Sequence, residues 1–248
     1  YEALLQFYKL FFKIKDHDFY IAGESYGGKH VPALGHKIHT ANQQSPKLKI
    51  PLKGLMIGNG YIDPENMLDY GQYLYGHGLI DNDERIHMEN TQEKIRYALL
   101  SGNWSMADEY SSLLYDDMLN KTSFTNLFDY TRENFKGDKS YTEFLLQDEI
   151  RKSIHAGGGS YEASSPKVHQ MFLGDIMKTV RPWIEELLEH YPILFYSGQF
   201  DIICAHPLTE NVFRNSHWSG ASVYGQAERQ VWRVENMIAG YYKSAGNL

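Results

Sequence analysis

The chain has 248 residues, a formal net charge of −7 and an apolar content of 42%. These values fit one large domain, or a domain with an insertion, that buries an ordinary hydrophobic core. Lysine and arginine form no dense cluster, so we expect no nucleic-acid partner. No stretch approaches the roughly 20 apolar residues that cross a bilayer, so we expect no membrane span.

The first segment, residues 1–60, alternates predicted helices and strands. Apolar residues at helical spacing predict an amphipathic helix that faces a core over 2–13, followed by a strand over 19–22. A second helix is predicted over 30–40 and a second strand over 52–57. Strands separated by helices indicate a parallel sheet, so the fold class that we expect is α/β.

The middle segment, residues 61–178, is polar and rich in tyrosine, and its apolar residues recur mostly at helical spacing. Asp81 and Asp83 precede Glu84 at positions where helix N-caps are expected. We interpret this segment as a helical insertion, or cap, rather than as part of a sheet.

The last segment, residues 179–248, returns to the first pattern. It contains a predicted helix over 182–190, a strand over 192–196 and a further helix over 208–213. Residues 240–248 end the chain where another strand is expected to begin. The two outer segments therefore predict one α/β core that the cap interrupts.

Cysteine and asparagine give opposite indications about the compartment. A single cysteine, Cys204, excludes an intrachain disulfide, which is typical of cytosolic proteins. Two Asn-x-Ser/Thr sequons, at Asn103 and Asn120, are candidate glycosylation sites and favour the secretory pathway. These residues alone leave the compartment open.

The stretch from Gly23 to Gly27, "GESYG", fits the pattern G-x-S-x-G, in which a nucleophilic serine occupies a sharp turn between a strand and a helix. Ser25 is the candidate nucleophile, and the N–H of Tyr26 is the candidate donor to a developing oxyanion. We expect a Cβ at Gly23 or at Gly27 to clash, because the backbones approach closely around the serine. The alternative is an ordinary glycine-rich loop.

A serine nucleophile needs a base and a carboxylate that orients the base. Asp201 is the candidate acid, because it follows a strand at the edge where open α/β sheets place functional residues. Asp63 and Asp175 are weaker candidates, and a turn-forming role is the alternative for Asp201. Of the two histidines that follow the acid, His206 is too close to it and His217 lies in a polar turn, so neither is convincing as the base.

Three histidines, His30, His36 and His39, lie on the helix that follows the elbow. A histidine on a helix face is usually structural, although His30 could reach the site. No cluster of carboxylates or cysteines accompanies His36 and His39, so we expect no metal site, and we expect no cofactor.

Four motifs, in this order, resemble the serine carboxypeptidases. "FYIAGESYGGKHVPALG" resembles the nucleophile region of that family, and "LKGLMIGNGYIDP" resembles the next strand and loop. "GDIMKTVRPWIEELLE" and "ILFYSGQFDIICAH" resemble the helix and strand that lead to the acid. The pattern is most similar to the vitellogenic-like branch, and the resemblance is weakest over residues 83–139.

The resemblance implies an α/β-hydrolase fold with the helical insertion over the site. It implies that Ser25 is the nucleophile, Tyr26 gives an oxyanion N–H and Asp201 orients the base. It further implies that Glu24 binds the C-terminal carboxylate of a peptide substrate. Two carboxyl groups that share a proton have a raised pKa, so acid pH would favour binding, which fits a secreted or lysosomal or vacuolar protein.

The chain departs from the family in two places. The family's catalytic histidine lies in a glycine-histidine motif beyond a further strand, and its glycine-rich oxyanion segment lies upstream of the position that matches Tyr1. The chain therefore resembles a partial α/β-hydrolase fold that lacks both ends. We expect a carboxypeptidase that works through an acyl-enzyme, and a chain that is nearly inactive by itself. An acyltransferase or esterase, or a truncated product without catalysis, is the alternative.

Overall fold

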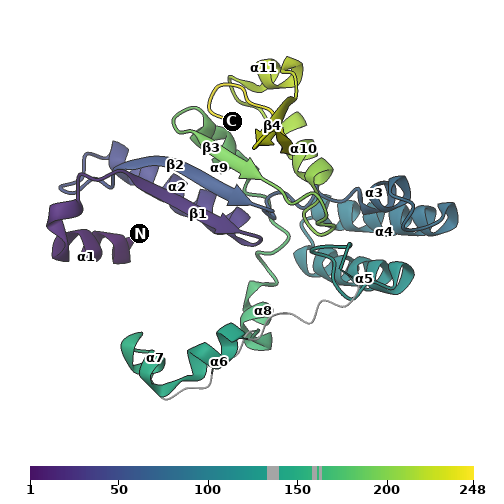
Figure 1. Ribbon diagram of the computed structural model, residues 1–248, viewed down its shortest axis with the longest axis horizontal. Coiled ribbons are helices and arrows are strands. Elements are labelled where there is room, and N and C mark those ends of the chain that lie inside the picture. The colour runs from purple at the N-terminus through teal and green to yellow at the C-terminus, as the bar shows by residue number, and fades with distance from the viewer. Residues whose placement is uncertain (133–139, 158–160, 162–163) are drawn as a thin grey trace.

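The computed structural model describes residues 1–132, 140–157, 161 and 164–248. Its centre is a parallel sheet in the strand order β1–β2–β3, formed by Phe19–Glu24, Leu52–Gly58 and Ile193–Tyr196 (Figure 1). Strand β2 lies in the middle, where Ile57 pairs with Gly23 of β1 on one side and with Phe195 of β3 on the other. The predicted α/β fold with a parallel sheet is confirmed.

One face of this sheet is covered by α2 (Gly27–Gln43) and α9 (Arg181–Leu188), which pack against each other. Gly35 of α2 lies where the three elements meet. A Cβ at this position would lie 2.7 Å from Leu55 of β2 and 3.3 Å from Leu187 of α9. The close approach of α2 to the sheet fixes the direction in which the preceding turn must leave β1.

The opposite face of the sheet is exposed. Its side chains include Tyr20 of β1, which is 54% exposed, and Leu194 and Tyr196 of β3, which are 56% and 50% exposed. This apolar face has no cover from the described residues.

The N-terminal helix differs from the prediction. Helix α1 spans Glu2–Leu10, and a short 3-10 turn, η1, spans Phe12–Ile14. The prediction that its apolar stripe faces a core is wrong for most of the stripe, because Phe7, Leu10 and Phe11 are 42%, 76% and 54% exposed. The helix packs mainly through the buried ring of Tyr8, which lies 6.4 Å from the ring of Phe19.

Helices occupy the described part of residues 61–178. They are α3 (Tyr70–Gly76), α4 (Asn82–Leu100), α5 (Trp104–Thr122), α6 (Ser140–Leu146), α7 (Asp148–Ser153) and α8 (Pro166–Phe172). Asp81 caps α4, since its carboxylate accepts from the N–H of Glu84 at 2.9 Å, whereas Asp83 lies in the first turn. Helices α4 and α5 pack along each other, and α6 and α7 lie away from the body of the chain (Figure 1).

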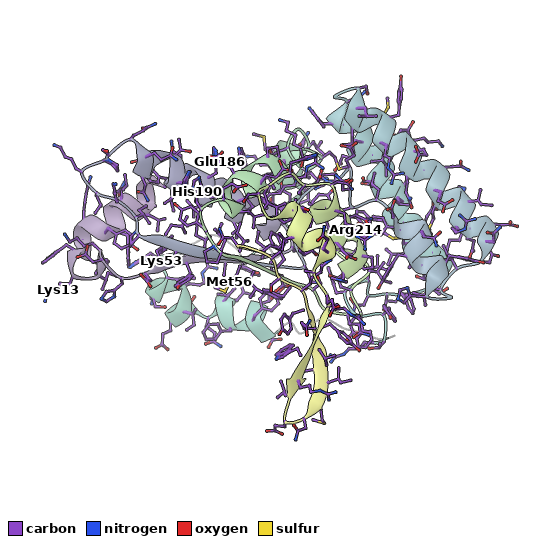
Figure 2. The ribbon with its side chains drawn as sticks, turned by 90° about the horizontal axis from the view of Figure 1, so that it is seen from above. Lys13, Lys53, Met56, Glu186, His190 and Arg214 are labelled. Carbon is purple, nitrogen blue, oxygen red and sulfur yellow. The ribbon has the colours of Figure 1, made fainter. Side chains whose placement is uncertain are left out.

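After β3 come α10 (His206–Arg214), α11 (Ala221–Gln226) and a separate antiparallel hairpin of β4 (Gln230–Val234) and β5 (Met237–Tyr242). The sequence did not predict this hairpin, which projects from the body in Figure 2. Its turn residues, Glu235 and Asn236, have φ angles of 49° and 67°. Within the described residues, no strand follows Tyr242.

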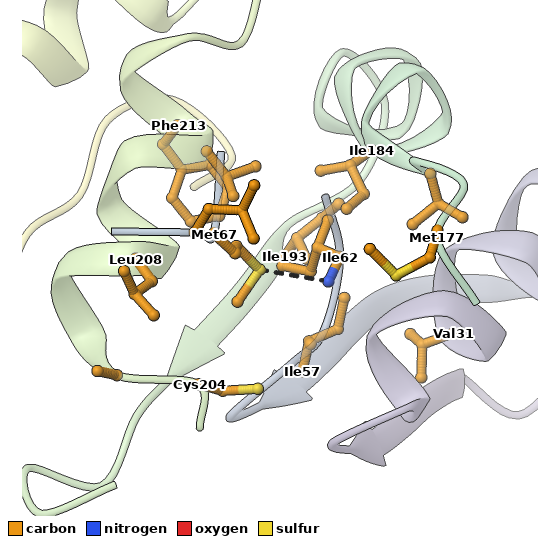
Figure 3. Packing of buried hydrophobic residues seen from close by; sticks show 14 of the residues in the cluster. Val31, Ile57, Ile62, Met67, Met177, Ile184, Ile193, Cys204, Leu208 and Phe213 are labelled. Carbon is orange, nitrogen blue, oxygen red and sulfur yellow. Dashed lines mark hydrogen bonds between the residues drawn. The ribbon is translucent and has the colours of Figure 1, made fainter. Parts of the chain in front are cut away.

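The core joins the sheet to the helices around it. Figure 3 shows Ile57 of β2 and Ile193 of β3 among buried residues that include Ile184 of α9 and Phe213 of α10. The loop after β2 enters the same core, because the N–H of Ile62 donates to Sδ of Met67 at 3.5 Å. Buried side chains of this core therefore support the carboxyl ends of β2 and β3.

Candidate active site

Ser25 occupies a strained turn between β1 and α2. Its φ angle is 56°, in the left-handed region that residues with a Cβ rarely adopt. The turn is held from both sides: the N–H of Ser25 donates to the carbonyl of Gly58 at 3.0 Å, and its carbonyl accepts from the N–H groups of Gly28 and Tyr61 at 2.9 Å each. The side chain of Ser25 is exposed, as a nucleophile requires.

The glycines around Ser25 differ from the prediction in one respect. A Cβ at Gly23 would lie 2.8 Å from Val31, as expected, but a Cβ at Gly27 would meet nothing within 4 Å. The expected clash at Gly27 is wrong. The crowded position is Gly28, where a Cβ would lie 2.7 Å from both the nitrogen and the oxygen of Tyr61. The adjacent glycines Gly27 and Gly28 were the only indication in the sequence that the second of them is crowded.

Tyr26 directly precedes α2, which begins at Gly27. Its backbone N–H has no hydrogen-bond acceptor among the described residues, so it is available to a ligand. Its hydroxyl group donates to Oδ2 of Asp175 at 3.0 Å. Burial, and then the bond and charge of Asp175, raise the pKa of Tyr26 far above its ordinary value. Asp175 therefore orients the Tyr26 ring.

Asp201 is 5% exposed and lies in the loop beyond β3. Its Oδ2 accepts from Nδ2 of Asn59 at 2.6 Å, and its Oδ1 accepts from the N–H of Cys204 at 3.2 Å. Burial raises the pKa of Asp201, the hydrogen bonds lower it, and the negative charge of Glu24 adds to the rise.

Asn59 is the site residue that the sequence analysis missed. It directly follows β2, with a φ angle of 40°. Its side chain bonds to Asp201 and also accepts from the N–H of Gly198 at 3.2 Å, while its N–H donates to the carbonyl of Tyr196 at 2.8 Å. Asn59 therefore fastens the acid-bearing loop to β2. Its position directly after a strand was the only available sequence signal.

The carboxyl ends of the three strands bring the candidate residues to one edge of the sheet. Glu24 is the last residue of β1 and is exposed, Ser25 follows it, and Asn59 and Asp201 follow β2 and β3. Asp63 makes a different interaction. It is 1% exposed, and its Oδ2 forms an ion pair with Nη1 of Arg181 at 3.3 Å.

The histidines do not complete this group. No hydrogen bond or ion pair joins a histidine to Ser25 or Asp201 within the part of the chain that the structure describes. His217 lies near Glu185, at 3.9 Å, and the His30 ring packs on Tyr26, with the ring centroids 5.0 Å apart. His206 is the first residue of α10.

Both sequon asparagines are exposed on α5 or at its start. Asn103 is the N-cap, and its side-chain oxygen accepts from the N–H of Met106 at 3.1 Å. Asn120 lies in the last turn of the helix. Both residues are therefore accessible from solvent.

The described residues contain no cluster suited to a metal ion and no helix suited to crossing a membrane. No group of three or more His, Cys, Asp and Glu side chains there could hold a metal ion. No helix in those ranges combines the length and apolar character that crossing a membrane requires.

Several known proteins that match this chain are described as carboxypeptidases. A profile of the family described as serine carboxypeptidase matches residues 1–248. The venom serine carboxypeptidase of Apis mellifera is 41% identical, with the match covering 99% of this chain and 55% of that protein. The vitellogenic carboxypeptidase of Aedes aegypti is 42% identical, over 98% of this chain and 53% of that protein.

A human protein described as probable serine carboxypeptidase CPVL is 35% identical, over 100% of this chain and 54% of its own length. The chain thus spans about half the length of these relatives. The crystal structure of Kex1(delta)p, a prohormone-processing carboxypeptidase from Saccharomyces cerevisiae, superposes with a TM-score of 0.81 at 21% identity, covering 98% of this chain and 59% of that one. This likeness shows the α/β-hydrolase fold, and the sequence matches show that the chain belongs to the serine carboxypeptidase family.

Proposed function

We propose that this chain carries the nucleophile and the orienting acid of a serine carboxypeptidase that releases C-terminal residues from peptides. The observation that supports this most is the arrangement at one sheet edge. The strained turn of Ser25 and the buried carboxylate of Asp201 both lie there, and Asn59 between them bonds to the acid. Family membership supports the same activity.

In the proposed reaction, Oγ of Ser25 attacks the carbonyl carbon of the last peptide bond while a base takes its proton. The N–H of Tyr26 stabilises the oxyanion. The released amino acid leaves with that proton, and water then hydrolyses the acyl-enzyme. Asp201 orients the base. Its carboxylate accepts from Asn59, from the N–H of Cys204 and from the N–H of Ile203, so with about four acceptor positions it can still receive an imidazole N–H.

Glu24 is the proposed partner of the substrate's C-terminal carboxylate. It is exposed and adjoins the nucleophile. Two carboxyl groups in contact retain a proton between them, so binding should be tightest at acid pH. This supports a secreted or lysosomal or vacuolar protein, and the exposed sequons at Asn103 and Asn120 are the proposed glycosylation sites.

We further propose that the base comes from a part of the protein outside these 248 residues, because no hydrogen bond or ion pair joins a described histidine to Ser25 or Asp201. The isolated chain should then be nearly inactive, since loss of a triad member costs several orders of magnitude in rate.

Labelling with a fluorophosphonate tests these roles. The whole protein that the gene encodes should label rapidly, Ser25→Ala should abolish labelling, and the 248-residue chain should label very slowly. Ser45→Ala is the matched control, because Ser45 is also exposed with a φ angle of 53°. Rapid labelling of the isolated chain that depends on Ser25 would contradict the proposed source of the base.

Turnover of the whole protein separates the alternatives. Cleavage of blocked dipeptides at acid pH is the expected result. Hydrolysis of small esters without peptide cleavage would instead indicate an esterase or acyltransferase. Absence of Ser25-dependent labelling would indicate a product without catalysis.

A further inference from the structure

A buried lysine lies next to the elbow. Lys29 is in the first turn of α2 and is only 3% exposed, although lysine is rarely so buried without a partner. Its Nζ donates to the backbone carbonyl of Lys178, in the segment that returns from the cap to α9. No carboxylate lies within ion-pairing distance of this ammonium group among the described residues.

Aromatic rings and more distant charges surround this ammonium group. Nζ lies 5.2 Å from the ring centre of Tyr61 and 6.0 Å from that of Tyr26, which is within the range of cation–π attraction. Burial lowers the pKa of Lys29 to about 8, against the charges of Asp175 and Asp63, which favour the ammonium form. Lys29 is therefore still a cation at neutral and acid pH.

The ring that Lys29 faces belongs to a residue that holds the elbow. The N–H of Tyr61 donates to the carbonyl of Ser25 at 2.9 Å, and the hydroxyl group of Tyr61 donates to Sδ of Met177 at 3.4 Å. The return segment is also bonded to this loop, because the N–H of Val180 donates to the carbonyl of Ile62 at 3.1 Å. Lys29 thus contacts both segments that pack on the turn of Ser25.

We propose that Lys29 is a positioning residue for Ser25: its ammonium group holds the Tyr61 ring and the Lys178 carbonyl against α2, and so maintains the left-handed backbone of the elbow. This inference rests on the proposed role of Ser25. A neutral side chain of equal length would fill the space but would leave the Lys178 carbonyl without its donor.

The test compares Lys29→Met with Lys29→Arg in the whole protein that the gene encodes. Lys37→Met is the matched control, because Lys37 is an exposed lysine on the same helix. Fluorophosphonate titration counts competent sites, so that kcat for a blocked dipeptide can be expressed per site. We expect Lys29→Met to lower kcat per site about tenfold with little change in KM, because small displacements of reacting groups are costly. Lys29→Arg should restore part of the rate.

A purely structural lysine would behave differently. It would reduce the number of titratable sites and leave kcat per site unchanged, and that result would overturn the proposal. So would a Lys29→Met variant that matches Lys37→Met in every measurement.

A second measurement does not depend on catalysis. Amide hydrogen exchange at Tyr61 in the whole protein that the gene encodes should be faster in Lys29→Met than in Lys37→Met. Equal exchange would overturn the role of Lys29 even in an active peptidase. Labelling of the whole protein that does not depend on Ser25 would instead end the proposed function, and with it the catalytic part of this inference.

Discussion

Nδ2 of Asn59 donates a hydrogen bond of 2.6 Å to Oδ2 of Asp201, a residue 142 positions further along the chain. This bond joins the loop after the middle strand to the loop after the third strand. The carboxylate is 5% exposed, so it depends on such donors. Asn59 is accordingly the residue whose loss should most directly disturb the Asp201 carboxylate without changing Ser25.

Asn59→Ala should lower the free energy of unfolding by about 1–3 kcal/mol, because it removes a donor from a buried carboxylate. The pKa of Asp201 should rise further, since the Asn59 bond now lowers it. Carboxyl-carbon NMR titration and urea unfolding measure the two effects.

Asn66→Ala is a matched control for this change. Asn66 donates to Oδ2 of Asp63 at the same distance, 2.6 Å, but on a carboxylate that Arg181 also pairs. It should destabilise the chain without changing the Asp201 titration. A shift of the Asp201 pKa in both variants, or in neither, would contradict the assignment.

The two glycines that follow Tyr26 should respond oppositely to alanine. Gly28→Ala should destabilise the chain by about 1–3 kcal/mol, because its Cβ would lie 2.7 Å from the backbone of Tyr61. Gly27→Ala should be neutral or stabilising by up to about 1 kcal/mol, since it has open space and lies in a helix. The urea midpoints of the two variants measure this difference in stability. Equal destabilisation by both variants would contradict the prediction.

A side chain with a Cβ at position 25 should lower the free energy of unfolding, because the backbone there is left-handed. Ser25→Gly should be more stable than Ser25→Ala by about 1 kcal/mol, because glycine adopts the φ angle of 56° without strain. Neither variant should react with a fluorophosphonate in the whole protein. Thermal melts of the two variants test the strain, and an alanine variant at least as stable as the glycine variant would argue against it.

His39 should make the stability depend on pH. It is 6% exposed, with its Nδ1 3.0 Å from the hydroxyl oxygen of Tyr191. Burial, and then the charge of His190, lower its pKa below the ordinary value of 6.5. The unfolded chain therefore binds a proton more readily, so the stability that His39 contributes above pH 6.5 is lost as the pH falls.

His39→Gln should flatten the loss of stability between neutral and mildly acid pH. His217→Gln is the control, because the His217 side chain is 89% exposed. Urea unfolding at a series of pH values measures both, and the same slope in His39→Gln as in the unchanged chain would contradict the role of His39.

The sequence predicted the three strands of the sheet and the helices between them because local periodicity carries that information. The strands of the sheet follow apolar runs, and the capping box at Asp81 and Glu84 is a contact across three residues. The elbow was found for the same reason, since its pattern spans five neighbouring residues from Gly23 to Gly27.

Features that depend on distant contacts were not predictable. Nothing in the residues around Asn59 or Lys29 indicates that they bond to Asp201 and Lys178. The stripe on α1 has the spacing of a core helix, but the sheet offers it contact mainly through Tyr8. The hairpin of β4 and β5 lacks a glycine in its turn, so its usual signal is missing.

The middle position of β2 has a consequence for folding. Its partner β1 is near in sequence, but β3 pairs with it only after the long stretch from Gly58 to Ile193 has closed into a loop. The entropy of closure grows slowly, by about 0.6 kcal/mol for each doubling of loop length. The length of the chain between β2 and β3 can therefore vary at small thermodynamic cost, whereas the high contact order of their pairing should make it the slow step of assembly.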